Sequence, residues 1–485
     1  MSSSEDQNFI GVLPEEVLSE IFKWLDLRSV KNASLVCQQW SRIIFSNHNI
    51  QRFCLVLDTR PLHSLIRGEL AKKWDAYSKW AHRKRKQFRR AVQHDEIQRI
   101  VQSQRCYRSL SCEQTEEKES TYLFKSLHPW KTEHLHTLKI DIKYQDCTKQ
   151  MLNLFASVIR CIPQLHSLVL SRESDSEQEQ KPWVELHSKT ERNLLLNGVF
   201  PAVFDMPALQ TLTTVQRTIH QAAHNFPLEN MKELTLKNPY DESDYVPNTN
   251  VHQRLTNLET LRYNTKIKEE EFLAVCKHSR LLKELVIERS HPISQERVFY
   301  HLAKLTNLRR LSLLDINIPG TVNCDLVKLS KLEYLNLGNL SVENSLVLNL
   351  PQSITNLTIK VTPQNERSLM RVITSSLPKL KMLSIHLPSD DRSVIAHAPI
   401  VTLRLLPLLT CLEVFEFSYG YFSKSCLFNM SAPMQRLRKL RLERCRLETK
   451  TLKGLHEKFP KLKELGFECC RLKSGDVIVD EYRCF

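Results

Sequence analysis

The sequence predicts an α/β protein, in which a small all-α domain of three helices precedes a solenoid with a parallel β-sheet on its concave face and helical returns on its convex face. Two patterns support this prediction: a leucine motif that recurs along two-thirds of the 485 residues, and apolar residues at helical spacing near the N-terminus. The nine glycines exclude some function classes. No two are closer than nine positions, so glycine-rich phosphate-binding loops and the nucleophile elbow of serine hydrolases are absent.

The leucine motif Leu-x-x-Leu-x-Leu, with conservative replacements, begins thirteen times between Leu135 and Leu462. From Leu209 onward the intervals are 22, 27, 24, 26, 24, 22, 26, 32, 25 and 25 residues, and all but one lie in the range of roughly 20–29 residues typical of leucine-rich repeats. Alternate residues of a strand face opposite sides, so the later leucines point inward and each repeat must stack on its neighbours. The sequence therefore predicts a leucine-rich-repeat solenoid of about 13 repeats over residues 131–485.

Some details of the solenoid are also predicted. Helical returns are expected at 367–377 and 450–459, and surface loops at the polar tracts 172–181 and 241–250. An inward position three residues beyond the strand is expected to be occupied by Ile316, Leu340, Cys445 and Cys470. The two cysteines are interpreted as small buried apolar residues. Because no two of the 14 cysteines are spaced CxxC, we expect reduced thiols, with no metal site and no cofactor.

The N-terminal region predicts a very small helical domain. Pro14 stands at a helix start, where its missing N–H costs nothing, and apolar residues from Leu13 to Leu25 recur at helical spacing. After a turn at 26–29, a further helix carries apolar residues between Val36 and Ile44. Such a short segment is near the lower size limit of an independent domain, so we expect a protein partner to cover its apolar stripe.

Residues 9–50 resemble an F-box. The resemblance rests on the spacing and type of Leu13-Pro14, Ile21-Phe22, Leu25-Asp26, Leu35-Val36-Cys37 and Trp40. An F-box followed by leucine-rich repeats is similar to the F-box/leucine-rich-repeat family, whose members are substrate receptors of Skp–cullin–F-box ubiquitin ligases.

The resemblance implies a non-catalytic subunit of the ubiquitin conjugation pathway, cytoplasmic and/or nuclear, without catalytic residues. Its partners would be a Skp-type adaptor and, through the adaptor, cullin and RING subunits. The adaptor-binding residues, some as contacts and some as the core of the domain, would be Leu13, Pro14, Val17, Ile21, Phe22, Leu25, Leu35, Val36 and Trp40.

The charge of +15 is concentrated in two segments, 67–110 and 435–473, and the rest of the chain sums to −2. The first lies in residues 51–130, which we expect to be a basic, mostly helical connector and a cap on the first repeat. Its aromatic residues fit packing better than base stacking, so nucleic acid is not expected as a partner. Nucleic-acid binding and a nuclear localisation signal at 83–90 are the alternative interpretations.

The sequence does not predict a membrane association. Residues 1–8 are expected to be a disordered polar tail without the features of a signal peptide. The longest apolar run, 405–412, is too short to cross a bilayer.

Substrate binding is expected on the outward residues of the repeat strands, namely Arg310, Tyr334, Asn336, His386, Glu416, Lys439 and Arg441. The positive charge of 435–473 predicts an acidic or phosphorylated substrate segment at that end. Two functions share all of these features. One is a substrate receptor that directs ubiquitin-dependent proteolysis, and the other is a repeat scaffold that engages the adaptor without directing degradation.

Overall fold

The computed structural model describes residues 13–46, 53–58, 98, 102, 107–115, 133–142, 149–172, 184–198, 200, 202–221, 223–237, 247–290, 295–314, 317–318, 322–338, 341–342, 346–362, 364–387, 399–423, 430–448, 455–472 and 482–484. The chain divides into two compact units. The first comprises Met1–Thr218 with Ala222–Pro227, and the second comprises Ile219–Gln221 with Leu228–Phe485. The predicted basic helix face at 83–90, the expected tail 1–8 and most of the polar tract 172–181 lie outside the described residues.

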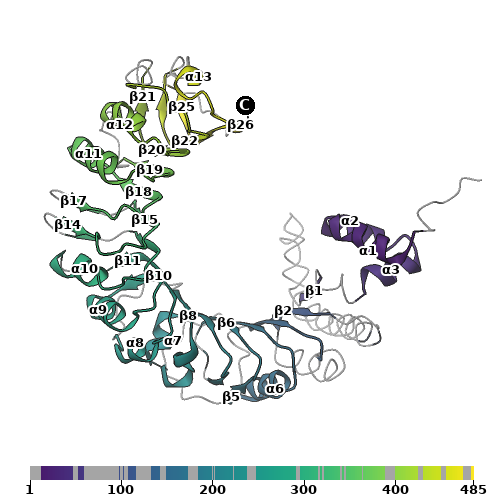
Figure 1. Cartoon of the computed structure of the whole chain (residues 1–485). Helices are drawn as coiled ribbons and strands as arrows, with labels where there is room; N and C mark the ends of the chain where they lie inside the picture. Colours follow the sequence, from purple (N-terminus) through teal and green to yellow (C-terminus); the bar gives the residue numbers. More distant parts are fainter. Residues whose placement is uncertain are drawn as a thin grey trace, which may run out of the picture. The chain divides into compact units, whose positions relative to one another are not determined.

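Three short helices begin the first unit, which confirms the predicted helical domain (Figure 1). They are α1 (Glu15–Trp24), α2 (Leu27–Ala33) and α3 (Gln38–Ile44). The Asp26 carboxylate caps α2 by accepting a hydrogen bond from the Ser29 N–H at 2.8 Å. The core of the domain consists of Leu18, Phe22, Val30, Ala33, Ile43 and Ile44.

A parallel ladder of strands follows in the first unit. In chain order the strands are β1 (Cys54–Asp58), β2 (Ser109–Thr115), β3 (Thr137–Ile142), β4 (Ser167–Arg172), β6 (Asn193–Asn197) and β8 (Thr211–Val215). Leucines opposite one another form one buried row, namely Leu110, Leu138, Leu168, Leu194 and Leu212. The other elements are α6 (Lys149–Arg160), the pair β5 (Val184–His187) and β7 (Ala202–Asp205), and η7 (Ala223–Asn225). Helix α7 (Gln216–Gln221) begins in the first unit, and its last three residues belong to the second.

Three strands of this ladder lie outside the thirteen predicted repeats. Strands β1 and β2 fall within the segment expected to be a helical connector. Strand β6 divides the long interval between Leu165 and Leu209. In its motif Glu191 stands where the first leucine is expected, three positions before Leu194, and the Glu191 side chain is fully buried. A charged residue at a leucine position is the reason why the pattern missed this repeat.

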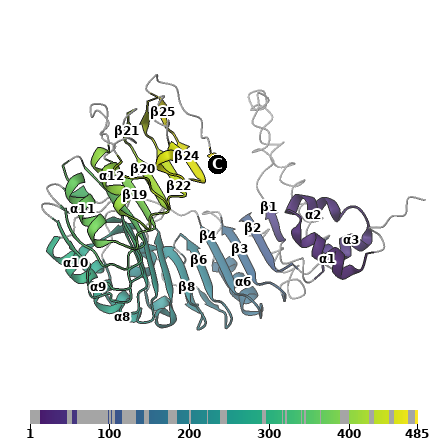
Figure 2. The same ribbon diagram turned by 45° about the horizontal axis from the view of Figure 1, so that its top comes forward.

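The second unit contains the regular part of the solenoid. Its sheet runs through β9 (Glu233–Lys237), β10 (Thr260–Ile267), β11 (Glu284–Ser290), β12 (Arg310–Leu313), β15 (Tyr334–Leu337), β18 (Asn356–Lys360), β19 (Met382–His386), β20 (Val414–Ser418), β22 (Lys439–Glu443) and β24 (Glu464–Glu468). These strands pair in parallel in this order, and the last ones, β19, β20, β22 and β24, are labelled in Figure 2. Strand β26 (Tyr482–Cys484) pairs antiparallel with β24 at the end of the sheet. The leucine positions of the motif lie in the core, apart from Leu462, which is half-buried.

In the second unit the strands of the sheet line the inner side of the curve, and the returns lie on its outer side (Figure 1). Helical returns are η8 (Leu228–Asn230), α8 (Asn250–Arg254), α9 (Glu269–His278), α10 (Gln295–Leu302), α11 (Glu366–Ser376), α12 (Ile400–Leu405), η9 (Leu406–Leu408) and α13 (Leu455–Lys458). Elsewhere the chain returns as short parallel strands, namely β13 (Asn317–Ile318) with β16 (Ser341–Val342), β14 (Val322–Asp325) with β17 (Leu346–Asn349), and β21 (Tyr421–Phe422), β23 (Arg446–Leu447) and β25 (Arg471–Leu472). The predicted α/β class, with a parallel sheet and largely helical returns, is confirmed.

The two predicted inward cysteines are buried. Cys445 and Cys470 are 1% and 0% exposed. Their thiols donate to carbonyl oxygens of the preceding repeat, at 3.4 Å to Phe417 and 3.2 Å to Leu442. Both cysteines therefore help to join neighbouring repeats. The equivalent Ile316 and Leu340 lie outside the described residues.

Candidate protein-interaction sites

The helical domain leaves large apolar side chains exposed although its own core is closed. Val17, Ile21 and Trp24 follow one another on a single face of α1, with 42%, 43% and 88% of their surface exposed. Leu27, Leu35 and Val36 add to them, and the last two lie in the turn between α2 and α3. We refer to these six residues, Val17, Ile21, Trp24, Leu27, Leu35 and Val36, as the F-box apolar surface.

The nine residues predicted to serve adaptor binding divide into three groups. Pro14, Val17, Ile21, Leu35 and Val36 are exposed. Leu13, Leu25 and Trp40 are half-buried and pack against the core. Phe22 is 2% exposed, and its ring meets that of Trp40 edge to face, with 5.2 Å between the ring centroids.

Phe22 therefore stabilises the domain and offers no surface to a partner. Sequence reasoning missed Trp24 and Leu27. The signal for Trp24 was available, because it continues the helical stripe of Val17 and Ile21.

The outward residues of the second unit's sheet form the other candidate site. Arg310 and Tyr334 are direct neighbours on β12 and β15, and the guanidinium carbon of Arg310 lies 4.4 Å from the centre of the Tyr334 ring. Arg310 Nε is 3.7 Å from Oε2 of Glu284, and Arg262 shares this carboxylate, its Nη2 lying 2.9 Å from Oε1. Asn336 is half-buried, and its Oδ1 accepts a hydrogen bond from the Gly338 N–H at 2.9 Å.

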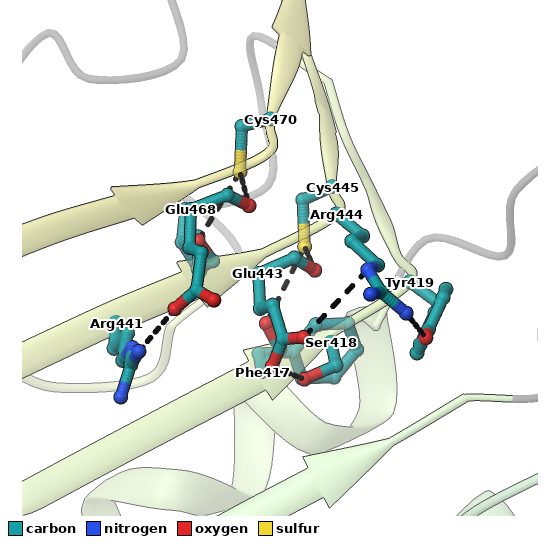
Figure 3. Close-up of polar contacts among 10 residues, drawn as sticks. Phe417, Ser418, Tyr419, Arg441, Glu443, Arg444, Cys445, Glu468 and Cys470 are labelled. Carbon is teal, nitrogen blue, oxygen red and sulfur yellow. Dashed lines mark hydrogen bonds and ion pairs between the residues drawn. The ribbon is translucent and has the colours of Figure 1, made fainter. Parts of the chain in front are cut away.

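The basic residues predicted at the C-terminal end are already paired. Nζ of Lys439 lies 3.1 Å from Oε2 of Glu464, and Arg441 forms an ion pair with Glu468 (Figure 3). The outward charged residues of β22 and β24 are Lys439, Arg441, Glu443, Glu464 and Glu468, whose formal charges sum to −1.

These two strands offer no surplus of positive charge, and the expectation of an acidic substrate segment at this end stays a prediction. The positive charge of 435–473 lies largely on other positions, such as the exposed Arg438, Arg446 and Lys463. The 25-residue spacing of the last two repeats could have revealed the pair of Lys439 with Glu464, because it places these residues side by side.

His386 and Glu416 lie half-buried on the neighbouring strands. Nε2 of His386 is 3.3 Å from Oγ of Ser384. Burial lowers the pKa of His386, and the carboxylates of Glu443 and Glu416 oppose this shift. Glu416 faces Arg441 in register, but the guanidinium of Arg441 pairs with Glu468 instead.

Three residues that follow strands β20, β22 and β24 adopt left-handed backbone conformations. Tyr419, Arg444 and Cys469 have φ values of 67°, 50° and 52°, a region that is strained for residues other than glycine. Arg444 donates a hydrogen bond to the Tyr419 hydroxyl, which joins two of these turns (Figure 3). After Tyr419, a side chain at Gly420 would meet the Phe417 ring at 2.2 Å, so this position requires glycine.

The described residues hold no group of three or more His, Cys, Asp and Glu side chains placed to hold a metal ion. A search of the described helices for one both long and apolar enough to cross a membrane found none.

Comparison with known proteins gives a match at the N-terminus. The F-box-like family model matches residues 10–56, and the search of curated proteins found no match. F-box domains bind Skp-type adaptors, and an F-box with leucine-rich repeats is typically a non-catalytic combination used for protein interaction.

Solved structures similar to the chain include three leucine-rich-repeat proteins. The TLR13–ssRNA13 complex matches at 15% identity with a TM-score of 0.42, over 75% of this chain and 55% of the other. A leucine-rich-repeat protein of Leptospira interrogans matches at 15% identity and 0.40, over 77% and 97%. The ectodomain of the receptor kinase GASSHO1/SCHENGEN3 of Arabidopsis thaliana matches at 14% and 0.30, over 76% and 38%. The chain thus spans about half the length of the first of these proteins.

The likeness to these structures is too low to carry an argument, and the strand ladder establishes the fold by itself. The match at residues 10–56 and the repeats that follow it together give the chain the domain architecture of F-box/leucine-rich-repeat proteins: an F-box-like domain followed by a leucine-rich-repeat solenoid.

Proposed function

We propose that the chain is the substrate-recognition subunit of a Skp–cullin–F-box ubiquitin-protein ligase. The F-box apolar surface docks the Skp-type adaptor, which links the chain to cullin and RING subunits. The sheet face of the repeats binds a protein substrate for ubiquitin-dependent proteolysis. The chain itself contributes proximity, because it holds the substrate near a ubiquitin-charged enzyme bound elsewhere on the complex.

The F-box apolar surface is the observation that supports this proposal. Monomeric proteins rarely expose a contiguous set of large apolar side chains unless it serves an interaction. Trp24 is 88% exposed and Leu35 is 78% exposed, and tryptophan is among the residue types most enriched at binding hot spots. Burial of one such side chain contributes about 1.5–3 kcal/mol, so most of the six are needed to offset an association cost on the order of 4–15 kcal/mol.

Adaptor binding is tested with the purified full chain and a variant that carries Leu35→Asp and Val36→Asp. Both side chains are exposed, so the changes leave the core of the domain intact. We expect intact chain to bind the adaptor and the variant to lose at least about a hundredfold in affinity, because docking would bury two unpaired charges.

A control is Leu408→Asp, which changes an exposed leucine in the second unit and should leave adaptor binding normal. Changes of Leu13 are less informative, since this residue packs against the core. The proposal is refuted if the intact chain does not bind the adaptor, or if the Leu35/Val36 variant binds as well as the control.

A ubiquitylation assay distinguishes the two proposed functions, a substrate receptor and a scaffold that engages the adaptor without directing degradation. A protein bound by the repeats should be ubiquitylated in a reconstituted ligase that contains the intact chain. The Leu35/Val36 variant should still bind that protein without supporting its ubiquitylation. Adaptor binding without ubiquitylation of any bound protein would favour the scaffold.

A further inference from the structure

Four outward residues on two adjacent strands form a set of hydrogen-bond donors at the middle of the second unit's sheet. Arg310 and Ser312 on β12 stand opposite Tyr334 and Asn336 on β15. We refer to these four residues as the donor square. Alternation along β12 buries Leu311 and Leu313 in the core, so Ser312 points to the outward face.

Ser312 provides the floor of the donor square. It is 6% exposed and stands opposite Asn336 in register. A serine hydroxyl on this face can donate a hydrogen bond to a group that comes from outside the chain.

Asn336 has a fixed orientation that presents its donor group. Its Oδ1 is occupied by the Gly338 N–H at 2.9 Å, which leaves the Nδ2 amide as the free end. Gly338 lies close to this amide, since a side chain at Gly338 would lie 3.1 Å from Oδ1 of Asn336. The hydrogen bond from Gly338 thus orients the Asn336 amide with its donors available beside Ser312.

Arg310 and Tyr334 supply the charge and the wall. The ring of Tyr334 holds the guanidinium at 4.4 Å, which limits the rotamers of Arg310. Glu284 engages the guanidinium only at 3.7 Å, and it lies closer to Arg262 at 2.9 Å. Arg310 therefore keeps donors for a further anion.

We propose that the donor square binds the carboxylate of an aspartate or glutamate side chain in the substrate protein. Donors without a matching acceptor select an acceptor-rich group, and the guanidinium fork matches the two oxygens of a carboxylate. The charge favours a single negative charge: Arg262, Glu284 and Arg310 sum to +1. A phosphate of nearly two charges would need further cations. The inference that this carboxylate belongs to a substrate rests on the proposed function.

The sequence favours an acidic ligand at the C-terminal end, near Lys439 and Arg441, whereas this proposal places a carboxylate at β12 and β15. Lys439 and Arg441 already have carboxylate partners in the next repeat. The two sites can therefore be compared directly in one experiment.

The test uses fluorescence anisotropy with a fluorescein-labelled glutamate–serine peptide and the full chain in complex with the adaptor, or alone. Matched probes are a glutamine–serine peptide and a phosphoserine–glycine peptide. We expect the glutamate peptide to bind, and Arg310→Gln and Asn336→Ala each to weaken binding by about tenfold, as expected for loss of one charge-assisted or one buried hydrogen bond.

The control variant carries Lys439→Gln and Arg441→Gln together. It removes two positive charges, whereas Arg310→Gln removes one. If the peptide were bound only by unspecific attraction to the basic chain, binding would therefore be weaker in the control than in Arg310→Gln. The proposal expects the opposite order, with the control close to the intact chain. Equal binding by Arg310→Gln, a larger loss in the control, equal binding of the glutamine peptide, or tighter binding of the phosphoserine peptide at the same residues would each overturn it.

Adaptor binding, measured on the same preparations, keeps this proposal separate from the proposed function. Failure of the intact chain to bind the glutamate peptide, together with normal adaptor binding, refutes the donor square alone. Peptide binding at the donor square by a chain that does not bind the adaptor refutes the ligase subunit and retains the site.

Discussion

Glu191 is expected to weaken the first unit at neutral pH. It stands at the first-leucine position of the repeat that contains β6 and is 0% exposed. Its Oε1 accepts a hydrogen bond from the Asn193 N–H at 3.1 Å, and Oε2 has no partner among the described residues. Burial raises the pKa of Glu191 from 4.5 to about 8, against the opposing effect of backbone hydrogen bonds.

The sign of the pH dependence follows from this shift. Between pH 4.5 and about 8 the folded chain retains a proton that the unfolded chain releases, so stability is full below the lower value and falls as the pH rises. At pH 7, which is 2.5 units above the unfolded value of 4.5, the free energy of unfolding is lower by about 3 kcal/mol. Glu191→Leu should remove this loss. Asn193 keeps its other hydrogen bond, from its N–H to the His166 carbonyl at 3.0 Å.

Hydrogen exchange measures this effect locally, because a repeat protein of this length need not unfold in one step. In Glu191→Leu, the amides of β6 should exchange about a hundredfold more slowly at pH 7 than in the intact chain. The gain should vanish toward pH 4.5. The exposed Glu185 in the same unit provides the control, and Glu185→Leu should leave the exchange of β6 unchanged. Equal protection of β6 in Glu191→Leu and the intact chain at pH 7 would refute the reasoning.

Three further predictions concern stability. Phe22→Ala should destabilise the F-box-like domain by about 3–5 kcal/mol because Phe22 is 2% exposed in its core; unchanged thermal unfolding of this domain would contradict this. Gly420→Ala should lower the unfolding midpoint in denaturant, since the added carbon would meet the Phe417 ring at 2.2 Å; an unchanged midpoint argues against the contact. Burial lowers the pKa of His252 from 6.5 to about 4, so its stabilisation is complete above pH 6.5 and falls by about 3 kcal/mol as the pH decreases to 4. His252→Gln, which can still bond the Tyr263 hydroxyl now 3.2 Å from Nε2, should flatten this part of the pH profile of unfolding; an identical profile would count against it.

The sequence by itself determined the features that depend on local spacing. Burial of alternate residues in a strand, and of every third or fourth residue in a helix, leaves a periodic pattern that needs no knowledge of distant contacts. The leucines from Leu209 onward, the stripe from Leu13 to Leu25 and the inward Cys445 and Cys470 are of this kind. For these residues the predicted repeats and helices agree with the structure, and so does the burial of Cys445 and Cys470 and of nearly all the repeat leucines.

The tertiary structure decided what depends on neighbours that are remote in the chain. Strand β6 joins the ladder although Glu191 replaces the first leucine of its motif. The strand is held by parallel pairing with β4 and β8 on either side, which the sequence motif does not show. Lys439 and Arg441 look like a binding surface in one repeat, and only the next repeat shows that carboxylates neutralise them. Ser312 looks like an ordinary polar residue until its burial is known. Charge pairing and side-chain burial depend on residues from several repeats, and for this reason no single stretch of sequence reveals them.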